Sequence, residues 1–293
     1  MLFGVPLELL YGQILLGLVN GSFYAILSLG LAVIFGMLHI INFAHGALYM
    51  FGAFLAWMMA EYLGIGFWPA IVIAPLVVGL LSAAFEIPLL RPLYRLIPLY
   101  GLLATFGLAL VLQGAFREIY GVSGMRYSIP EALQGGVDVG FMFLPIYRIW
   151  VVAASLLVCA GTWYLIEKTR YGIYIRAAEE NAPLVRTFGI PVSRLVTLTY
   201  ASGAALAAFA GVLAAPIYSV NAMMGADIII LVFAIVVIGG MGSIRGPIIA
   251  GYALGLIEGL TKTYFPEAAN TVVFVFMVMV LLVRPAGLFG RAR

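Results

Sequence analysis

The sequence predicts an all-α integral membrane protein, a polytopic helical bundle of about 8–10 transmembrane segments. Of its residues, 65% are hydrophobic and only 9% are charged, against about 45–50% and about 25% in soluble domains. The apolar runs approach or exceed the ~20 residues that a spanning helix needs, and they lack the alternation of a transmembrane strand. Because lipid-exposed backbone must satisfy its own hydrogen bonds, only helices and closed barrels span membranes, and these runs favour helices.

Hydropathy along the chain predicts nine apolar segments. They cover residues 9–37, 40–61, 68–90, 97–117, 147–166, 195–216, 227–242, 245–263 and 268–284. We expect the whole chain, residues 1–293, to form a single transmembrane domain that contains one polar loop, residues 167–195. No basic region precedes the first apolar run, so a cleavable signal peptide is not expected.

The positive charges predict the orientation of the chain. With the polar loop placed in the cytoplasm and the spans alternating outward from it, eleven Lys and Arg residues fall inside and four outside. The positive-inside rule describes this asymmetry. The N-terminus is therefore expected outside, on the periplasmic side of a bacterial membrane, and the C-terminus in the cytoplasm.

The polar loop holds eight of the 27 charged residues and carries the signals of a short helix. Asn181 is a residue type that caps helix starts, and Pro183 is tolerated in a first turn. Gly189 is typical of the position that follows a helix, and Pro191 prevents continuation. These signals predict a helix of about two turns.

The apolar residues of this short helix suggest a docking surface. Leu184, Val185 and Phe188 recur at spacings of three and four, which predicts that they share one face. Glu179 and Glu180 lie at the positive end of the helix dipole. An amphipathic helix presented to the cytoplasm is suited to a groove in a partner protein. The alternative is an ordinary solvated loop, which needs neither the apolar triad nor the defined end.

Several stretches of the sequence are distinctive enough to indicate a known family of membrane proteins. The first is NGSFYAILSLGLAVIFGMLHIINFAHGALYMFGAF, in which INFAHG is the most distinctive element. The others are RAAEENAPLVRTFGI followed by ASGAALAAFAGVLAAP, then VIGGMGSIRGPIIAGYALGLIEGL, and finally LLVRPAGLFGR. Together these stretches resemble the permeases of ABC importers for branched-chain amino acids. The resemblance covers nearly the whole chain and is weakest between about residues 120 and 147.

The resemblance implies a transmembrane permease subunit that moves branched-chain, apolar amino acids into the cytoplasm and is not an enzyme. Its implied partners are two cytoplasmic ATPase subunits, a second permease subunit in a heterodimer, and a periplasmic amino-acid-binding protein. It also implies a multi-pass protein of the bacterial inner membrane, in contact with lipid and without a nucleic acid partner. The implied ATPase-coupling residues are Glu179, Glu180, Asn181, Leu184, Val185, Phe188 and Gly189.

We expect neither a nucleotide site nor a metal site in this chain. A P-loop requires Gly-x-x-x-x-Gly-Lys-Ser/Thr, and neither of the two lysines, Lys168 and Lys262, follows a glycine. ATP would therefore be bound by the partner subunits, and the chain itself carries no cofactor. His39 and His45 are six residues apart, unlike the four-residue spacing of a helical metal pair.

Polar residues within the apolar segments are costly there and are the candidates for a translocation pathway. They are Asn20, Asn42, His45, Thr105, Gln113 and Glu258. For Asn42 and His45 the alternative is structural pairing with backbone where a helix breaks. For Glu258 the alternative is a structural ion pair beside a row of glycines that packs closely against another helix. Glu86 is expected to form a local ion pair with Arg91.

Two other functions stay open. Permeases for urea or short amides have a very similar pattern, which the sequence alone does not separate from that of amino acid permeases. An ion-coupled secondary transporter, with Glu258 and His45 as proton carriers, would need no ATPase subunit and would leave the polar loop unexplained. An intramembrane enzyme would need acids, histidines or an activated nucleophile clustered at one depth, and the sequence does not indicate such a cluster.

Overall fold

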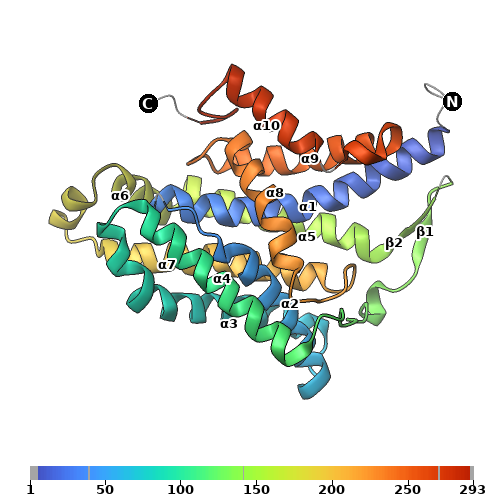
Figure 1. The fold of residues 1–293 in the computed structure, drawn as a ribbon, viewed down its shortest axis with the longest axis horizontal. Coiled ribbons are helices and arrows are strands. Elements are labelled where there is room, and N and C mark those ends of the chain that lie inside the picture. Colours follow the sequence, from blue (N-terminus) through green and yellow to red (C-terminus); the bar gives the residue numbers. More distant parts are fainter. Residues whose placement is uncertain (1–5, 39, 141, 270, 291–293) are drawn as a thin grey trace. The chain divides into compact units, whose positions relative to one another are not determined.

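The computed structural model of the chain describes residues 6–38, 40–140, 142–269 and 271–290, and these residues are mostly helical (Figure 1). Each of the nine predicted apolar segments overlaps a helix, with boundaries that differ by a few residues. In chain order these helices are α1 (Leu7–Leu38), α2 (Ala44–Leu63), α3 (Phe67–Phe85), α4 (Pro98–Tyr120), α5 (Ile146–Lys168), α7 (Val192–Ala214), α8 (Met224–Gly239), α9 (Arg245–Tyr264) and α10 (Val272–Val283). A further helix, α6 (Arg170–Thr187), lies in the polar loop.

Six helical segments among the described residues are long and apolar enough to cross a membrane. They are α1, α2, α4, α5, α7 and the continuous helical run Phe67–Tyr94, which begins with α3. Two more apolar helices, α8 and α10, are shorter. The predicted fold class, an all-α membrane protein, is confirmed. The number of spans and the orientation stay predictions.

The helical run that begins with α3 changes its geometry at two prolines. A π-helical turn, Glu86–Leu90, follows α3 and is succeeded by a 3-10 turn, Arg91–Arg95. Pro88 and Pro92 lack the backbone N–H that a regular helix uses, and a proline ring clashes with the preceding turn. A wider and then a tighter turn accommodate these residues while the chain stays helical.

The chain divides into two compact units. The first comprises Met1–Ser28, Ile129–Gly161 and Leu231–Arg293, and the second comprises Leu29–Ser128 and Thr162–Ile230. In the second unit α7 packs along α2 and α3, and α2 also packs against α4 (Figure 1).

Glycines permit the closest helix contacts in both units. In the second unit, a Cβ atom added to Gly46 would lie only 2.3 Å from the carbonyl oxygen of Gly225. In the first unit, a Cβ atom on Gly255 of α9 would lie 2.5 Å from the carbonyl oxygen of Gly17 on α1. The predicted glycine packing face of α9 is therefore confirmed, and small residues serve the purpose they often have in membrane helices.

The segment between α4 and α5 folds as a short hairpin. Strands β1 (Gly136–Asp138) and β2 (Phe143–Pro145) are antiparallel, with Val137 opposite Leu144. A 3-10 turn, Glu131–Leu133, precedes them. No apolar segment was predicted between residues 117 and 147, and the strands are an addition that the sequence did not indicate.

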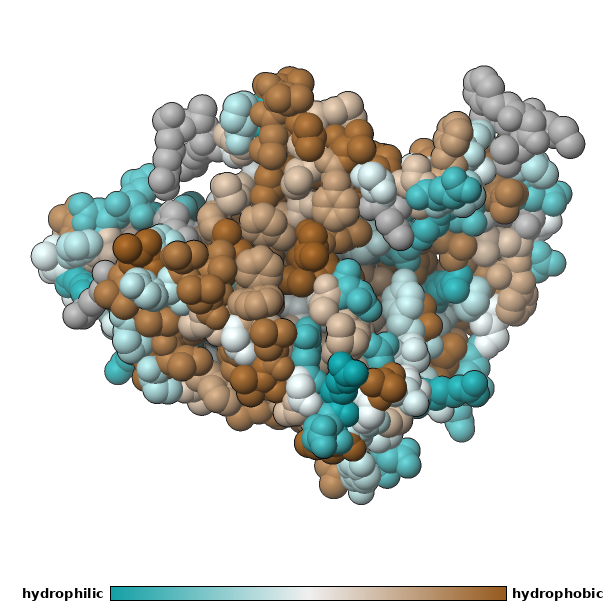
Figure 2. All heavy atoms as spheres, in the orientation of Figure 1, coloured by the Kyte–Doolittle hydropathy of each residue, from teal (hydrophilic) through white to brown (hydrophobic). Residues whose placement is uncertain are grey.

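Polar and apolar side chains gather over different elements of the second unit (Figure 2). In this view hydrophobic residues, in brown, cover α3 and α4, whereas hydrophilic residues, in teal, gather over α6. Exposed side chains of α3 and α4 include Leu76, Leu80, Leu103 and Leu110. Such exposed leucines are suited to contact with lipid chains rather than water.

Candidate functional site

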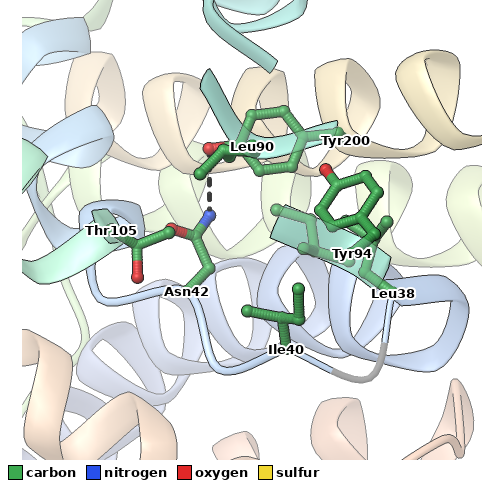
Figure 3. Close-up of a pocket in the computed structure, with 8 residues that line it drawn as sticks. Leu38, Ile40, Asn42, Leu90, Tyr94, Thr105 and Tyr200 are labelled. Carbon is green, nitrogen blue, oxygen red and sulfur yellow. Dashed lines mark hydrogen bonds between the residues drawn. The ribbon is translucent and has the colours of Figure 1, made fainter. Parts of the chain in front are cut away.

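A small pocket lies in the second unit where the chain breaks between α1 and α2 (Figure 3). Its apolar lining is Ile34, Leu38, Ile40 and Leu90, and its polar lining is Asn42, Tyr94, Thr105 and Tyr200. These residues come from α1, the α1–α2 connection, the two irregular turns after α3, α4 and α7. The break between α1 and α2 thus lets six parts of the chain contribute to one pocket.

Asn42 provides the polar contact across the pocket. Its amide Nδ2 donates a hydrogen bond to the Tyr200 hydroxyl at 3.4 Å, as the dashed line in Figure 3 shows. Its amide oxygen accepts the backbone N–H of Ala44 at 3.1 Å, at the start of α2. Asn42 is buried, so these two contacts offset the cost of placing its amide away from water. The pairing with backbone at a helix break, given from the sequence as the alternative for Asn42, is present, and its role in the pathway stays a prediction.

Thr105 connects α4 by hydrogen bonds to the segment between α1 and α2. Its hydroxyl accepts the backbone N–H of Phe43 at 3.2 Å. The hydroxyl proton is within reach of the carbonyl oxygens of Ile41, at 3.2 Å, and Leu102, at 3.0 Å. Because a hydroxyl has a single proton, it serves one of these carbonyls at a time. The structure therefore brings together two of the predicted pathway residues, Thr105 and Asn42.

The chemistry of the pocket is mixed and uncharged. Four aliphatic side chains face an amide and three hydroxyls, and the empty volume is about 220 Å³ including the open mouth. In this conformation the space is too tight for an amino acid, because the enclosed cavity is only about 10 Å³, about enough for one water molecule. The pocket can hold an apolar group beside weak hydrogen-bonding partners only after its walls separate.

His45 occupies a different position, in the first turn of α2. Its side chain is fully buried. A Cβ atom added to Gly30 of α1 would lie 3.0 Å from the His45 Cε1 atom, and 3.1 Å from Leu206 of α7. The imidazole thus fills the room left by a glycine between two helices. A role for His45 in the pathway stays a prediction.

The remaining predicted pathway residues do not line the pocket. Gln113 is half-buried on α4, two turns beyond Thr105. Asn20 is half-buried on α1 and belongs to the first unit. Glu258 is also in the first unit, where it accepts a hydrogen bond from the Tyr24 hydroxyl at 2.6 Å and pairs with Lys262 one turn along α9. The structural ion pair that was the alternative for Glu258 is present, and its role in the pathway stays a prediction.

The helix α6 is divided into two parts by a kink at Asn181. At Asn181 the backbone leaves the helical region, with φ −151° and ψ 83°. The amide oxygen of Asn181 accepts the backbone N–H of Leu184 at 3.0 Å, which is an N-cap interaction. Gly189 ends the segment with φ +78°, a left-handed conformation that suits glycine. The predicted start and end of the short helix are confirmed, whereas the helical part before Asn181 was not predicted.

The second part of α6 presents its apolar residues in two directions. Val185 is buried against Ile175 and Leu195, so the prediction that it shares an outer face with its neighbours is wrong. Leu184 and Phe188 are 53% and 74% exposed. Since Leu184 and Val185 are adjacent, about 100° separates them around the helix, and only one can face inward. The exposed face carries Leu184 and Phe188.

The first part of α6 is anchored to its neighbours by polar contacts. The Tyr171 hydroxyl lies 3.1 Å from the Thr199 hydroxyl of α7, and Arg176 donates to the Ile166 carbonyl at 2.6 Å. Burial raises the pKa of Tyr171, and hydrogen bonds with Thr199 and Ser202 partly offset this effect. The side chain therefore stays neutral and holds α6 against α7.

Sequence reasoning missed Tyr200 and Tyr94 as pocket residues. Tyrosines are common in apolar segments of this chain, which has 16 of them, so neither carried a local signal. Among the described residues, no three His, Cys, Asp or Glu side chains gather into a possible metal site. His39, the other half of the histidine pair, lies outside the described residues.

Comparison with known proteins gives consistent matches over almost the full length. A family model described as the permease component of branched-chain amino acid transport systems matches residues 13–283. The chain is 31% identical to the high-affinity branched-chain amino acid transport system permease protein BraD of Pseudomonas aeruginosa, over 95% of each chain. It is 32% identical to LivH of Escherichia coli, a permease protein of the same description, again over 95% of each chain. Identity to the Escherichia coli permease protein LivM is 29%, over 92% of this chain and 68% of LivM.

Proposed function

Because the chain belongs to the family of permease components of branched-chain amino acid transport systems, we propose that it is the permease subunit of an ABC importer. It carries branched-chain, apolar amino acids into the cytoplasm, and separate ATPase subunits power it. The observation that carries this proposal is the capped second part of α6, which exposes Leu184 and Phe188 beside a defined kink. An exposed leucine–phenylalanine pair on a short helix is suited to a hydrophobic groove in another protein.

The second part of α6 supports an arrangement in which this chain forms the pathway and a separate ATPase subunit binds to it. The first part of α6 is fixed to α7 through Tyr171, whereas the second part, beyond Asn181, presents its apolar pair outward. A motor subunit that seats Leu184 and Phe188 would therefore transmit its movement to α7. In the proposed orientation this helix faces the cytoplasm, where ATP is available.

The pocket at Asn42 is the proposed narrow point of the pathway in the second unit. Its aliphatic side chains suit the side chain of leucine, isoleucine or valine, and its uncharged amide and hydroxyls suit the polar end of the molecule. A charged amino acid group cannot cross bare hydrocarbon, since the cost is several kcal/mol at least. The weak Asn42–Tyr200 hydrogen bond is the contact that must separate when the substrate passes.

The proposed assembly contains a second permease chain. LivH and LivM of Escherichia coli both match this chain, which supports a pair of related permeases in one transporter. Two cytoplasmic ATPase subunits and a periplasmic binding protein complete the proposed complex in the bacterial inner membrane. The periplasmic protein supplies the selectivity, so that the pathway itself needs only modest affinity.

Purification of the chain from its native membrane in mild detergent, followed by identification of the proteins that accompany it, tests the assembly. The expected result is an ATPase pair together with a second permease chain. The variant Leu184→Asp with Phe188→Asp is purified in the same way, and it should insert into the membrane yet lose the ATPase pair. A chain that purifies alone, even after crosslinking, would point instead to a secondary transporter.

A further inference from the structure

A buried carboxylate joins two segments of the second unit beside the pocket. The Glu86 side chain is fully buried, and its Oε2 atom accepts hydrogen bonds from Arg91 Nη2 at 3.0 Å and from the Thr197 hydroxyl at 2.7 Å. Arg91 also donates to the Thr197 hydroxyl and to the Ser193 carbonyl, the latter at 3.5 Å. We call Glu86, Arg91, Ser193 and Thr197 the α3–α7 latch.

The irregular turn after α3 makes the latch possible. In the π-helical turn that contains Pro88, the backbone N–H of Arg91 donates to the carbonyl of Glu86, five residues earlier. In a regular α-helix, residues five apart point about 140° away from each other. A π-helical turn is wider and its hydrogen bonds join residues five apart, so it brings Arg91 closer to the side of the helix that carries Glu86, and Arg91 reaches the Glu86 carboxylate. The local ion pair predicted from the sequence is confirmed, and its link to α7 is new.

The two latch residues on α7 lie close to α6. Ser193 and Thr197 belong to the first two turns of α7, which begins directly after the loop that ends α6. Two residues beyond Thr197, Thr199 contacts Tyr171 of α6. A displacement of α6 therefore reaches this end of α7 through both covalent connection and a polar contact.

Both segments joined by the latch, the irregular turns after α3 and the helix α7, also contribute residues to the pocket. Leu90 and Tyr94 follow Glu86 in the irregular turns, and Tyr200 lies one turn beyond Thr197 on α7. All three line the pocket. A buried ion pair is seldom needed for stability, because apolar residues of similar volume often serve equally well. The hydrogen bonds of the latch are directional, however, and fix one segment against the other.

We propose that Glu86 is a positioning residue that makes Leu90 and Tyr94 move together with Tyr200 when α7 is displaced through α6. The inference rests on the proposed function, since it needs a motor seated on α6. With the latch intact, displacement of α7 moves Leu90, Tyr94 and Tyr200 together, and the pocket opens. Without it, ATP is hydrolysed and α7 moves, but the irregular turns after α3 do not follow.

The amount of amino acid transported per ATP hydrolysed tests this proposal. The complete transporter is reconstituted in liposomes with Thr197→Val, Thr197→Ser or Glu86→Gln in the permease. Thr197→Val and Glu86→Gln should lower the transport ratio by about two- to thirtyfold, the range found for residues that carry coupling between sites. Hydrolysis itself should stay close to the unmodified rate. Thr197→Ser keeps the hydroxyl and should restore the ratio, which a role in packing alone does not explain.

A matched control is Thr263→Val in α9, which removes a hydroxyl that donates to the Gly259 carbonyl of its own helix at 3.1 Å. It should leave the ratio unchanged. An unchanged ratio in Thr197→Val, or an equal loss in Thr197→Ser, would overturn the latch. If Glu86→Gln does not accumulate in the membrane, the two Thr197 variants still decide. Absence of ATP-driven uptake by the unmodified complex would instead overturn the proposed function and the latch with it.

Discussion

The exposed pair on α6 gives a prediction whose size follows from the structure. Leu184→Ala together with Phe188→Ala removes most of the apolar surface that the second part of α6 presents. Neither side chain belongs to the buried cluster around Val185, so the fold of α6 should persist. The Asn181 cap depends on the backbone N–H of Leu184, which alanine retains. The variant therefore tests docking rather than folding.

The expected loss of affinity is large enough to measure. Full burial of an apolar side chain of this size contributes about 1.5–3 kcal/mol. The exposed share, 53% for Leu184 and 74% for Phe188, is the surface that a partner can cover. Together the two side chains therefore contribute about 2–4 kcal/mol. At 1.4 kcal/mol for each factor of ten, the Kd should rise about 30- to 700-fold.

The assay measures binding of the purified ATPase subunit to the permease in lipid nanodiscs. The matched control is Phe106→Ala with Leu110→Ala, an exposed phenylalanine–leucine pair four residues apart on α4, at 46% and 52% exposure. The control should bind the ATPase subunit as the unmodified chain does. Equal binding by the α6 variant would refute the assignment of Leu184 and Phe188 as docking residues, and with it the physical basis of the proposal.

Three further predictions concern the pocket, the helix contacts and the first unit. Tyr200→Phe removes the hydroxyl that accepts the hydrogen bond from Asn42. Because this contact must separate when the substrate passes, the initial rate of uptake should rise about fivefold, as the loss of about 1 kcal/mol at this contact implies. An unchanged initial rate would argue against a gate there. Gly46→Ala places a methyl group 2.3 Å from the Gly225 carbonyl oxygen, and overpacking of this kind should cost about 1–3 kcal/mol, seen as a lower melting temperature in detergent. Glu258→Gln keeps the hydrogen bond with Tyr24 available, so ATP-driven uptake should persist; its abolition, with uptake in the unmodified chain sensitive to a protonophore, would revive proton coupling.

Local signals in the sequence predicted local structure well. Asn181 and Gly189 located the start and end of the short helix because capping depends on residues within one turn. The burial of Val185 was mispredicted because it depends on residues far from it in the sequence. Helical spacing states which residues share a face, but the choice of the buried face depends on α7 and on the first part of α6.

Contacts between distant segments lay beyond the reach of the sequence. Asn42 and Tyr200 are 158 positions apart, and nothing near Tyr200 indicates its partner. Glu86 and Arg91 were correctly paired because they are neighbours, whereas the third member of the cluster, Thr197, lies 111 positions from Glu86. Of the residues that line the pocket, only Asn42 and Thr105 were named from the sequence, as separate pathway candidates, and the tyrosines emerged only from the fold.

The most direct test of the proposed function is uptake by the complete transporter in liposomes with ATP enclosed at the cytoplasmic face. Leucine, isoleucine and valine should each be accumulated and compete with one another, and accumulation should survive collapse of the proton gradient. Urea at the same concentration should neither enter nor compete. Uptake of urea in place of the amino acids would assign a different substrate, and uptake that stops with the proton gradient would contradict an ATP-driven importer.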